Sequence, residues 1–120
     1  MSATKVFRVT TIDDVMVIEL IGVVSSLADA SINKELDNVR KQLNAGAFHL
    51  VIIDLGQVSY FGSSMLEAIR ALWNELTPRQ GRLVLCNASE VGREILQVAK
   101  FDHLWPLVET REQALKLLKN

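Results

Sequence analysis

Scarce residue types set the first limits on this chain. It contains one cysteine, two histidines and two prolines among 120 residues. The single thiol, Cys86, cannot form an internal disulfide, which is typical of proteins kept in a reducing compartment. His49 and His103 stand apart from each other and from Cys86, so they do not form the ligand cluster that a metal ion requires. We therefore expect neither a disulfide framework nor a metal site.

Long apolar runs and runs of one charge are also missing. The longest apolar stretch, residues 15–24, is interrupted by Glu19 and is too short to cross a bilayer. The first ten residues, MSATKVFRVT, lack the apolar core of a signal peptide. Thirteen basic and fourteen acidic side chains nearly cancel, and no segment gathers Lys and Arg as nucleic-acid binding requires. These features predict a cytoplasmic protein that neither inserts into membranes nor binds nucleic acid.

The composition itself is that of an ordinary globular domain. Apolar residues make up 49% of the chain and charged residues 22%, which is enough to build a core between two or three layers of secondary structure. No stretch rich in Pro, Gly or Ser divides the chain. We predict a single domain over residues 1–120.

The first third of the chain predicts a hairpin and a helix. Two apolar runs, FRVTT and VMVIELIG, flank Asp13-Asp14 and indicate two antiparallel strands. The second run is apolar on both faces except at Glu19, which favours a strand inside a sheet. A helix with a start at Ser26 and Asp29 and a stop at residues 44–46 is then predicted by apolar residues at helical spacing, namely Ile32, Leu36, Val39 and Leu43.

Strands and helices alternate over the rest of the chain. Short apolar runs predict strands at residues 50–53, 83–86 and 107–108. Shared apolar positions predict two helices between them, one with Leu66, Ile69, Leu72 or Trp73, and Leu76, the other with Val91, Ile95 and Val98. Ser89 is the expected cap of the second of these, and Thr110 with Gln113 forms a capping box that opens a last helix.

The resulting order, ββαβαβαβα, predicts an α/β fold. Strands that alternate with helices pair in parallel through right-handed crossovers, whereas the opening hairpin is antiparallel. We therefore expect a mixed, mostly parallel sheet.

Catalytic and cofactor motifs are not found. The loop LGQVSYFGSS has two glycines and no lysine, so it lacks the pattern of a phosphate-binding loop. The serines in FGSSM are not flanked by glycines on both sides, and no histidine base or acid completes a triad. Cys86 in its apolar strand is typical of a small core residue. We predict no enzyme activity and no cofactor.

One segment, residues 54–66, stands out by its position between a buried strand and a helix. Its loop holds Val58, Tyr60 and Phe61 and delivers two serines to the helix start. Ser64 and Glu67 have the spacing of a capping box, which would leave Ser63 exposed just outside the helix. A role for both serines as simple caps stays open.

This segment resembles the signature of the STAS domain family, which is named for sulfate transporters and anti-sigma factor antagonists. The matching positions are Asp54, Leu55, Val58, Phe61, Ser63, Ser64 and Leu66. The resemblance extends along the chain through the hairpin end at Ile21-Gly22, the strands LVIIDL and RLVLCN, and residues 101–104. It implies a STAS-like fold with the same order of elements.

The resemblance also implies a function. It indicates a regulatory module that docks an anti-sigma factor, commonly a serine kinase, and that is phosphorylated on the first serine of the motif, Ser63. Gly62 stands where the family usually has Asp, and Met65 and Glu67 stand where it usually has glycines. The alternative is a constitutive subunit of a transport or signalling scaffold, in which Ser63 is only a cap.

The expected partner-binding surface is the loop before the helix together with its first turn. Aromatic side chains there suggest contact rather than simple solvation. The candidate residues are Tyr60, Phe61, Gly62, Ser63, Ser64 and Met65. On this hypothesis, Met65→Asp removes partner binding and leaves thermal unfolding nearly unchanged. The sequence does not predict an oligomeric state.

Overall fold

The described residues form a sheet of five strands, whose spatial order is the order in which they follow one another along the chain. The computed structural model describes residues 7–21, 29–58 and 62–119. The strands are β1 (Phe7–Ile12), β2 (Val15–Leu20), β3 (Leu50–Asp54), β4 (Arg82–Cys86) and β5 (Leu107–Val108). β1 pairs antiparallel with β2, and the other three pairings are parallel. The predicted mixed, mostly parallel sheet is confirmed.

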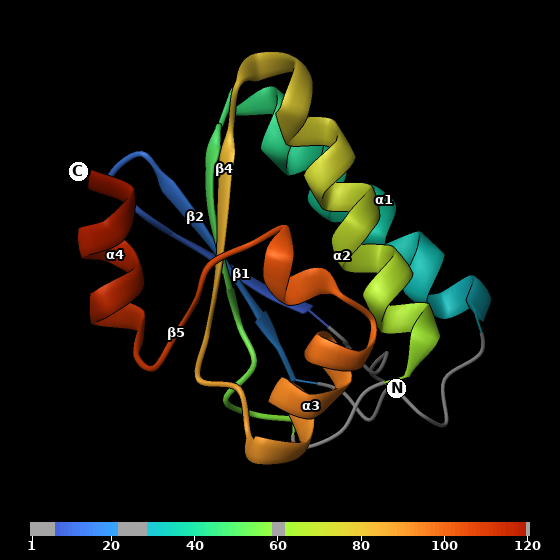
Figure 1. The fold of residues 1–120 in the computed structure, drawn as a ribbon. Helices are drawn as coiled ribbons and strands as arrows, with labels where there is room; N and C mark the ends of the chain where they lie inside the picture. The colour runs from blue at the N-terminus through green and yellow to red at the C-terminus, as the bar shows by residue number, and fades with distance from the viewer. Residues whose placement is uncertain (1–6, 22–28, 59–61, 120) are drawn as a thin grey trace.

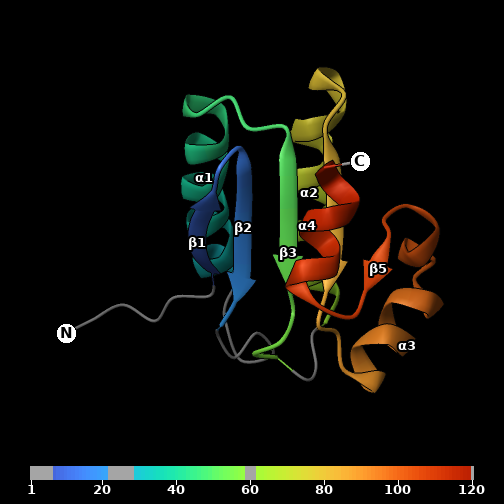
Figure 2. The same cartoon turned by 90° about the vertical axis from the view of Figure 1, so that its left-hand side faces the viewer.

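In the part of the chain that the structure describes, four α-helices and two short 3₁₀ helices connect and flank these strands. They are α1 (Asp29–Ala45), α2 (Ser63–Leu76), η2 (Thr77–Arg79), α3 (Glu90–Val98), η3 (Phe101–His103) and α4 (Arg111–Lys119). Figure 1 shows the helix pair α1 and α2 on one side of the sheet and α4 on the other, and Figure 2 looks onto the sheet with α4 in front of it and α1 and α2 behind it. The predicted order of elements is confirmed.

The two faces of the sheet support cores of different size. Alternate residues of a strand point to opposite faces, so Met16 and Ile18 lie in a core with α1, α2 and α3, whereas Val15 and Val17 lie in one with α4. The larger core includes Leu36, Val39 and Leu43 of α1, as their spacing predicted. The predicted start of that helix at Ser26 lies outside the described residues.

Local signals for the start of a helix are confirmed at two places. The Ser89 hydroxyl accepts a hydrogen bond from the Gly92 N–H at 3.0 Å and caps α3. At α4, the Gln113 N–H donates to Thr110 Oγ1 at 3.1 Å, and Gln113 Oε1 accepts from the Thr110 N–H at 3.3 Å. Both ends of the predicted capping box are therefore formed.

Helix α3 does not bury the predicted side, which carries Val91 and Val98. Gly92 and Leu96 are buried, whereas Val91 is 49% and Val98 is 85% exposed. In a helix of nine residues, several apolar spacings fit the same sequence. In the folded protein, α3 buries the side that carries Gly92 and Leu96, and Val91 and Val98 lie at the surface.

Candidate functional site

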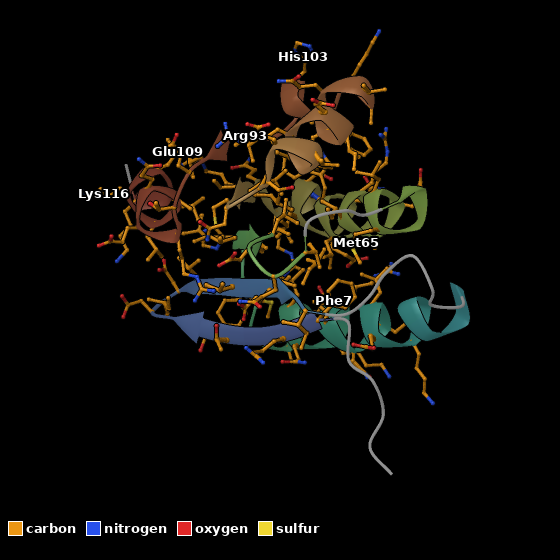
Figure 3. The ribbon with its side chains drawn as sticks, turned by 90° about the horizontal axis from the view of Figure 1, so that it is seen from below. Phe7, Met65, Arg93, His103, Glu109 and Lys116 are labelled. Atoms are coloured by element: carbon orange, nitrogen blue, oxygen red, sulfur yellow. The ribbon has the colours of Figure 1, made fainter. Side chains whose placement is uncertain are left out.

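The candidate site lies at the carboxyl end of the parallel strands. The connections that follow β2, β3 and β4 all lead to helices in the same layer, because α1, α2 and α3 share one core. In an open α/β sheet, a ligand crevice forms where adjacent connections turn to opposite faces. Between β2 and β4 the connections do not diverge, so this part of the carboxyl end presents a surface built from loops and helix starts. Figure 3 looks onto this end of the molecule.

Asp54, the last residue of β3, accepts four hydrogen bonds at this end. It is 4% exposed, the one charged residue among the buried positions described. Its Oδ2 accepts from Arg111 Nε at 3.1 Å and from Arg111 Nη2 at 2.7 Å. Its Oδ1 accepts from the Gly56 N–H at 2.9 Å and from Asn87 Nδ2 at 3.1 Å. Both carboxylate oxygens are thus satisfied, as a buried charge requires.

A row of charged side chains extends from this carboxylate across the sheet. Arg8, Glu19 and Asp54 are register partners on neighbouring strands and therefore lie on the same face. Glu19 accepts from Arg8 Nη1 at 3.2 Å and lies 3.9 Å from Arg111 Nη2. The Arg111 guanidinium lies near both Glu19 and Asp54, so each charge has an opposite neighbour.

The ionisation of Asp54 follows from these contacts. Burial raises the pKa of Asp54, but the hydrogen bonds from Gly56, Arg111 and Asn87 and the charge of Arg111 together outweigh burial. The pKa of Asp54 therefore lies below its ordinary value of 3.8. The residue is an anion at neutral pH.

The loop after β3 is fixed by backbone bonds as well. The Leu55 N–H donates to the Cys86 carbonyl at 2.9 Å, and the Val58 N–H donates to the Leu55 carbonyl at 3.2 Å. A Cβ on Gly56 would lie 3.1 Å from Asp54 Oδ1 and 3.3 Å from Asn87 Cβ, so the chain passes very close to both side chains here. The described part of this loop is a defined turn.

Helix α2 starts earlier than predicted. Its N-cap is Gly62, and Ser63 and Ser64 are the first two helical residues, so the predicted cap at Ser64 and the predicted place of Ser63 outside the helix are both wrong. The Gly62 carbonyl accepts from the Met65 N–H at 3.1 Å and from the Leu66 N–H at 3.2 Å. The first turn contains no acidic residue. The positive end of the helix dipole is therefore not offset there by a negative side chain.

The expectation that Met65 lies on a contact surface is wrong. Met65 is fully buried, and it begins a buried stripe that continues through Ala68, Ile69, Leu72 and Leu76. Figure 3 shows Met65 in the interior, whereas His103 lies at the periphery. The spacing i, i+3, i+4, i+7 was present in the sequence, but Leu66 beside it offered a second stripe one residue away. Leu66 is only half-buried.

The other predicted contact residues fall into two groups. Tyr60 and Phe61 lie outside the described residues. Gly62 is half-buried as the N-cap, and its φ of −103° is open to any residue type. A Cβ built on Gly62 meets nothing within 4 Å. Glycine is thus not needed at this position for steric reasons.

Arg111 and Asn87 are the residues at this end that sequence analysis missed. Arg111 lies 57 residues from Asp54 along the chain, so no local pattern joins the two. Asn87 has a φ of 62° directly after β4. Asn is among the few residues that adopt this left-handed conformation readily, which was the available signal for a special turn there.

The cysteine lies where the sequence indicated. Cys86 is fully buried in β4, and its role as a small core residue is confirmed. Burial, and next the negative charge of Asp54, raise the pKa of the Cys86 thiol to about 12. The thiolate that reacts with electrophiles is therefore scarce at neutral pH. His49 directly precedes β3, and both histidines are exposed.

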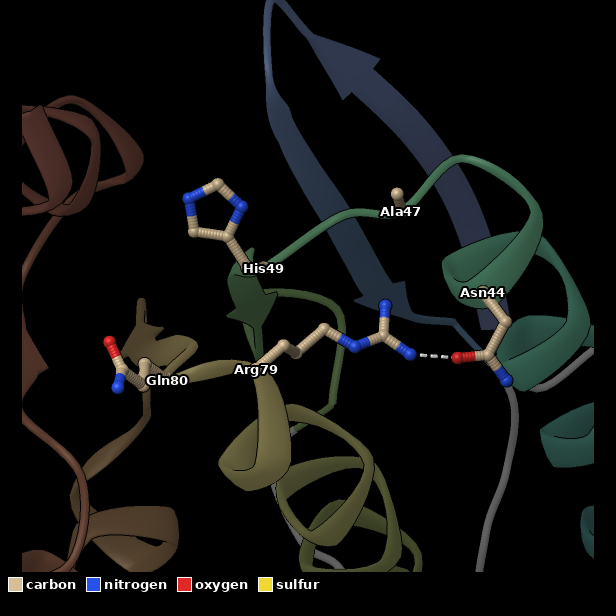
Figure 4. Close-up of a pocket in the computed structure, with 5 residues that line it drawn as sticks. All are labelled: Asn44, Ala47, His49, Arg79 and Gln80. Atoms are coloured by element: carbon tan, nitrogen blue, oxygen red, sulfur yellow. Dashed lines mark hydrogen bonds between the residues drawn. The ribbon is translucent and has the colours of Figure 1, made fainter.

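A shallow hollow lies at the opposite end of the sheet. Figure 4 shows its lining: Asn44, Ala47, His49, Arg79 and Gln80. Arg79 Nη1 donates to the carbonyls of Phe48 at 3.0 Å and Leu43 at 3.4 Å, and its Nη2 donates to Asn44 Oδ1. These bonds join the end of α1 to the loop before β3 and to η2. The arginine serves the structure of this end.

Two further features concern ions and membranes. Within residues 7–21, 29–58 and 62–119, no three His, Cys, Asp or Glu side chains gather as a metal site requires. None of the helices in that part of the chain has both the length and the apolar character needed to cross a bilayer.

The fold and this end of the sheet define a class of protein: an α/β domain that presents the start of one helix beside a fixed loop. The family model described as STAS domain matches residues 7–114. The chain therefore belongs to the STAS domain family.

Two similar proteins are described as anti-sigma factor antagonists. The candidate anti-sigma factor antagonist BtrV of Bordetella bronchiseptica is 31% identical over 108 residues, which are 90% of each chain. The structure of an anti-sigma factor antagonist (STAS) domain protein from Planctomyces limnophilus is 28% identical with a TM-score of 0.71, covering 95% of this chain and 98% of that one.

The anti-sigma factor antagonist SpoIIAA shares the fold. Its unphosphorylated form has a TM-score of 0.80 at 22% identity and covers 94% of this chain and 96% of its own. Its phosphorylated form, from Bacillus, has a TM-score of 0.71 at 22% identity, with 92% and 96% covered. At this identity the likeness speaks for the fold alone.

Proposed function

We propose that this protein is an anti-sigma factor antagonist that acts by binding rather than by catalysis. It docks an anti-sigma factor, which in this class is commonly a serine kinase, through the loop after β3 and the start of α2. Phosphate on Ser63 switches the docking off. The match to BtrV over most of both chains supports the class of partner.

The observation that carries the switch is the position of Ser63. It is the first residue of α2, and the first turn of that helix has no acidic side chain. A phosphate there adds a charge of about −1.5 to −2 at a helix N-terminus, where the dipole favours an anion by about 0.3–1 kcal/mol. The domain therefore stays folded when modified. That SpoIIAA has been solved in a phosphorylated form supports the view that this fold tolerates phosphate.

The effect of the phosphate falls on the interface. A partner that packs against the start of α2 must desolvate the added charge without a group built to pair with it. Mismatched charges in an interface cost about 2–5 kcal/mol, which is more than tenfold in affinity. Phosphorylation of Ser63 therefore releases the partner.

The contact surface proposed here no longer includes Met65, because a fully buried side chain offers no area to a partner. Tyr60, Phe61, Gly62, Ser63 and Ser64 remain candidates. Gly62 acts as the N-cap without a side chain, and the space beside it is open. An approaching partner thus meets backbone here, where the family usually offers an acidic side chain.

The departures from the family signature favour one alternative. Gly62 replaces the usual Asp, and a kinase that recognises that Asp would not act on Ser63. In that case the chain is a constitutive subunit of a transport or signalling scaffold that binds through the same surface. A sigma factor or small serine kinase gene beside that of this protein supports the first function, and a permease gene supports the second.

The test begins with affinity capture from the native cell, with mass spectrometry to identify the bound protein and any phosphoserine. Affinity for the captured anti-sigma factor is then measured for wild type, Ser63→Ala and Ser63→Glu beside their melting temperatures. We expect Ser63→Glu to bind more than tenfold more weakly, with Ser63→Ala like wild type. Equal affinities in all three would leave only the constitutive alternative.

A second pair of variants isolates the charge at position 62. Gly62→Asp and Gly62→Asn each place a side chain of nearly the same shape in the open space beside the helix start. Both side chains can cap the helix, and they differ only in charge. If the partner reads this position by charge, the two variants differ in affinity although both fold. Identical affinities would show that position 62 does not select the partner.

A further inference from the structure

The carboxylate of Asp54 joins two parts of the molecule that lie on opposite faces of the sheet. One oxygen, Oδ2, is held by the Arg111 guanidinium at the start of α4, on the face of the smaller core. The other, Oδ1, holds the Gly56 N–H in the loop that leads towards α2, on the face of the larger core. A carboxylate is rigid and planar, so the orientation of one oxygen determines that of the other.

The arginine that holds this carboxylate is itself held in place. Arg111 is the first residue of α4, directly after the Thr110 cap whose bonds with Gln113 fix the helix start. Its two nitrogens bind the same oxygen of Asp54 at 2.7 Å and 3.1 Å, a contact with a defined direction. Glu19, 3.9 Å away, adds a second negative neighbour to the guanidinium.

The loop has little freedom once this contact is made. The Gly56 N–H has the Asp54 oxygen as its acceptor, and the N–H groups of Leu55 and Val58 donate to the carbonyls of Cys86 and Leu55, respectively. A Cβ on Gly56 would lie 3.1 Å from Asp54 Oδ1 and 3.3 Å from Asn87 Cβ, so the loop backbone passes close to both side chains. A change in the orientation of Asp54 therefore takes the acceptor away from the Gly56 N–H unless the loop moves with it.

We infer that Arg111 is a positioning residue for partner recognition: from the helix on the far face of the sheet, it orients Asp54 and so sets the conformation of residues 55–58 before Ser63. The part of this inference that concerns the partner rests on the function proposed above. The part that concerns the loop does not.

The experiment compares Arg111→Gln and Arg111→Lys with Arg40→Gln. Gln removes the charge and the two-nitrogen contact, whereas Lys keeps the charge without the fork. Arg40 makes a matched control, because it binds Glu75 through two nitrogens at 3.2 Å and 2.7 Å and is 39% exposed against 35% for Arg111. It lies at the other end of the molecule.

The first measurement is amide hydrogen exchange by NMR at Leu55, Gly56 and Val58. We expect exchange there to accelerate roughly 2- to 30-fold in Arg111→Gln, less in Arg111→Lys, and not in Arg40→Gln. The amides of Phe48 and Gly81, which bond within the opposite end, serve as internal references. Unchanged exchange at residues 55–58 in both Arg111 variants would overturn the inference, and Arg111→Lys keeps the test available if the Gln variant does not fold.

The second measurement is the affinity of each variant for the captured anti-sigma factor, made well below the melting temperature of that variant. We expect a loss of roughly 2- to 30-fold for Arg111→Gln and none for Arg40→Gln. A faster-exchanging loop with unchanged affinity would show that the positioning does not serve recognition. If wild type binds no anti-sigma factor, the proposed function fails, while the exchange data still decide whether Arg111 positions the loop.

Discussion

The two ends of the sheet each carry a cluster of charged side chains, but the clusters differ in what they hold. At the amino end, Arg40 Nη2 lies 2.7 Å from Glu75 Oε2, and Asn44 and Arg79 add bonds around the ends of α1 and α2. At the carboxyl end, Arg111 Nη2 lies at the same distance from Asp54 Oδ2. The Glu75 side chain is 24% exposed and that of Asp54 is 6% exposed.

The difference in burial gives two similar ion pairs different roles. Water can solvate Glu75 if Arg40 is removed, so this pair only joins two surface helices. Asp54 has little access to water, and it also accepts the N–H of a loop residue, so the loss of either partner leaves a buried charge or a backbone donor unsatisfied. The carboxyl end, which carries the candidate site, is therefore the end where single substitutions matter most.

The largest effect is expected for Met65→Asp at the start of α2. Placing a charge in a fully buried position and losing the methionine contacts costs about 3–5 kcal/mol of unfolding free energy. Denaturant unfolding measures this loss. Met65→Leu, which nearly conserves volume, is the control and should cost less than about 1.5 kcal/mol. Near-wild-type stability of Met65→Asp would mean that the residue is exposed after all.

A smaller loss is expected for Asp54→Ala, and it directly compares the two ends. The substitution leaves the Gly56 N–H and Asn87 amide without their acceptor and should cost about 2–4 kcal/mol. Glu75→Ala removes the matching carboxylate at the amino end and should cost only about 0.2–1 kcal/mol. Denaturant unfolding of the two variants in the same buffer decides the point. Equal losses would contradict the distinction drawn between the ends.

Acidification should reveal the contribution of each carboxylate. The pKa of Asp54 is lowered in the folded protein, so its contribution is complete above its ordinary value of 3.8 and is lost as the pH falls through the folded value. The stability difference between wild type and Asp54→Asn should therefore shrink below about pH 4. Hydrogen bonds from Arg40 lower the pKa of Glu75 below its ordinary value of 4.5. The stability difference between wild type and Glu75→Gln should therefore shrink as the pH falls below about 4.5. A difference that grows on acidification would contradict this sign.

Replacing the threonines at helix ends is expected to lower stability by a moderate amount at the carboxyl end of the sheet and by little at the amino end. Thr110→Ala removes the acceptor of the Gln113 N–H and should cost about 0.5–2 kcal/mol. Thr77 at the amino end donates only to the exposed Asn74 carbonyl, and Thr77→Ala should change stability by no more than about 0.5 kcal/mol. Thermal unfolding of both variants provides the comparison. A larger loss at Thr77 than at Thr110 would reverse it.

The smallest effect, and the one expected gain, concerns Gly62. Asn accepts hydrogen bonds from the first turn that glycine cannot, so Gly62→Asn should raise the unfolding free energy by a few tenths of a kcal/mol, about the difference between these caps. The open space at this position leaves room for the side chain. Differential scanning calorimetry can resolve the shift. Destabilisation would indicate that glycine is required here for a reason that its φ does not reveal.

Much of the fold follows from local signals in the sequence. The hairpin around Asp13-Asp14, the buried strands and the caps at Ser89 and Thr110 depend on neighbouring residues and were predicted as the structure has them. The serine pair of the segment after β3 lies at the start of a helix, as the sequence indicated. These features depend on backbone preferences and periodicity, which act over a few residues.

Other features were decided by packing between distant segments. The sheet and the α1 helix determine which side of α2 is covered, and this buried Met65 rather than Leu66. The same choice in α3 buried Gly92 and exposed Val98. In both helices the sequence offers more than one apolar side, and only the layer against which the helix packs selects among them.

The sequence by itself determined the order of the elements, the family and the place of two serines at the start of a helix, because each is encoded by residues close together in the chain. Only the tertiary structure decided that Asp54 is held by Arg111, 57 residues away, and that this carboxylate also holds the loop before α2. Such a contact forms where a strand end and a helix start meet across the sheet. Its physical basis is the requirement that a buried charge find partners, and the fold alone determines which side chains are within reach.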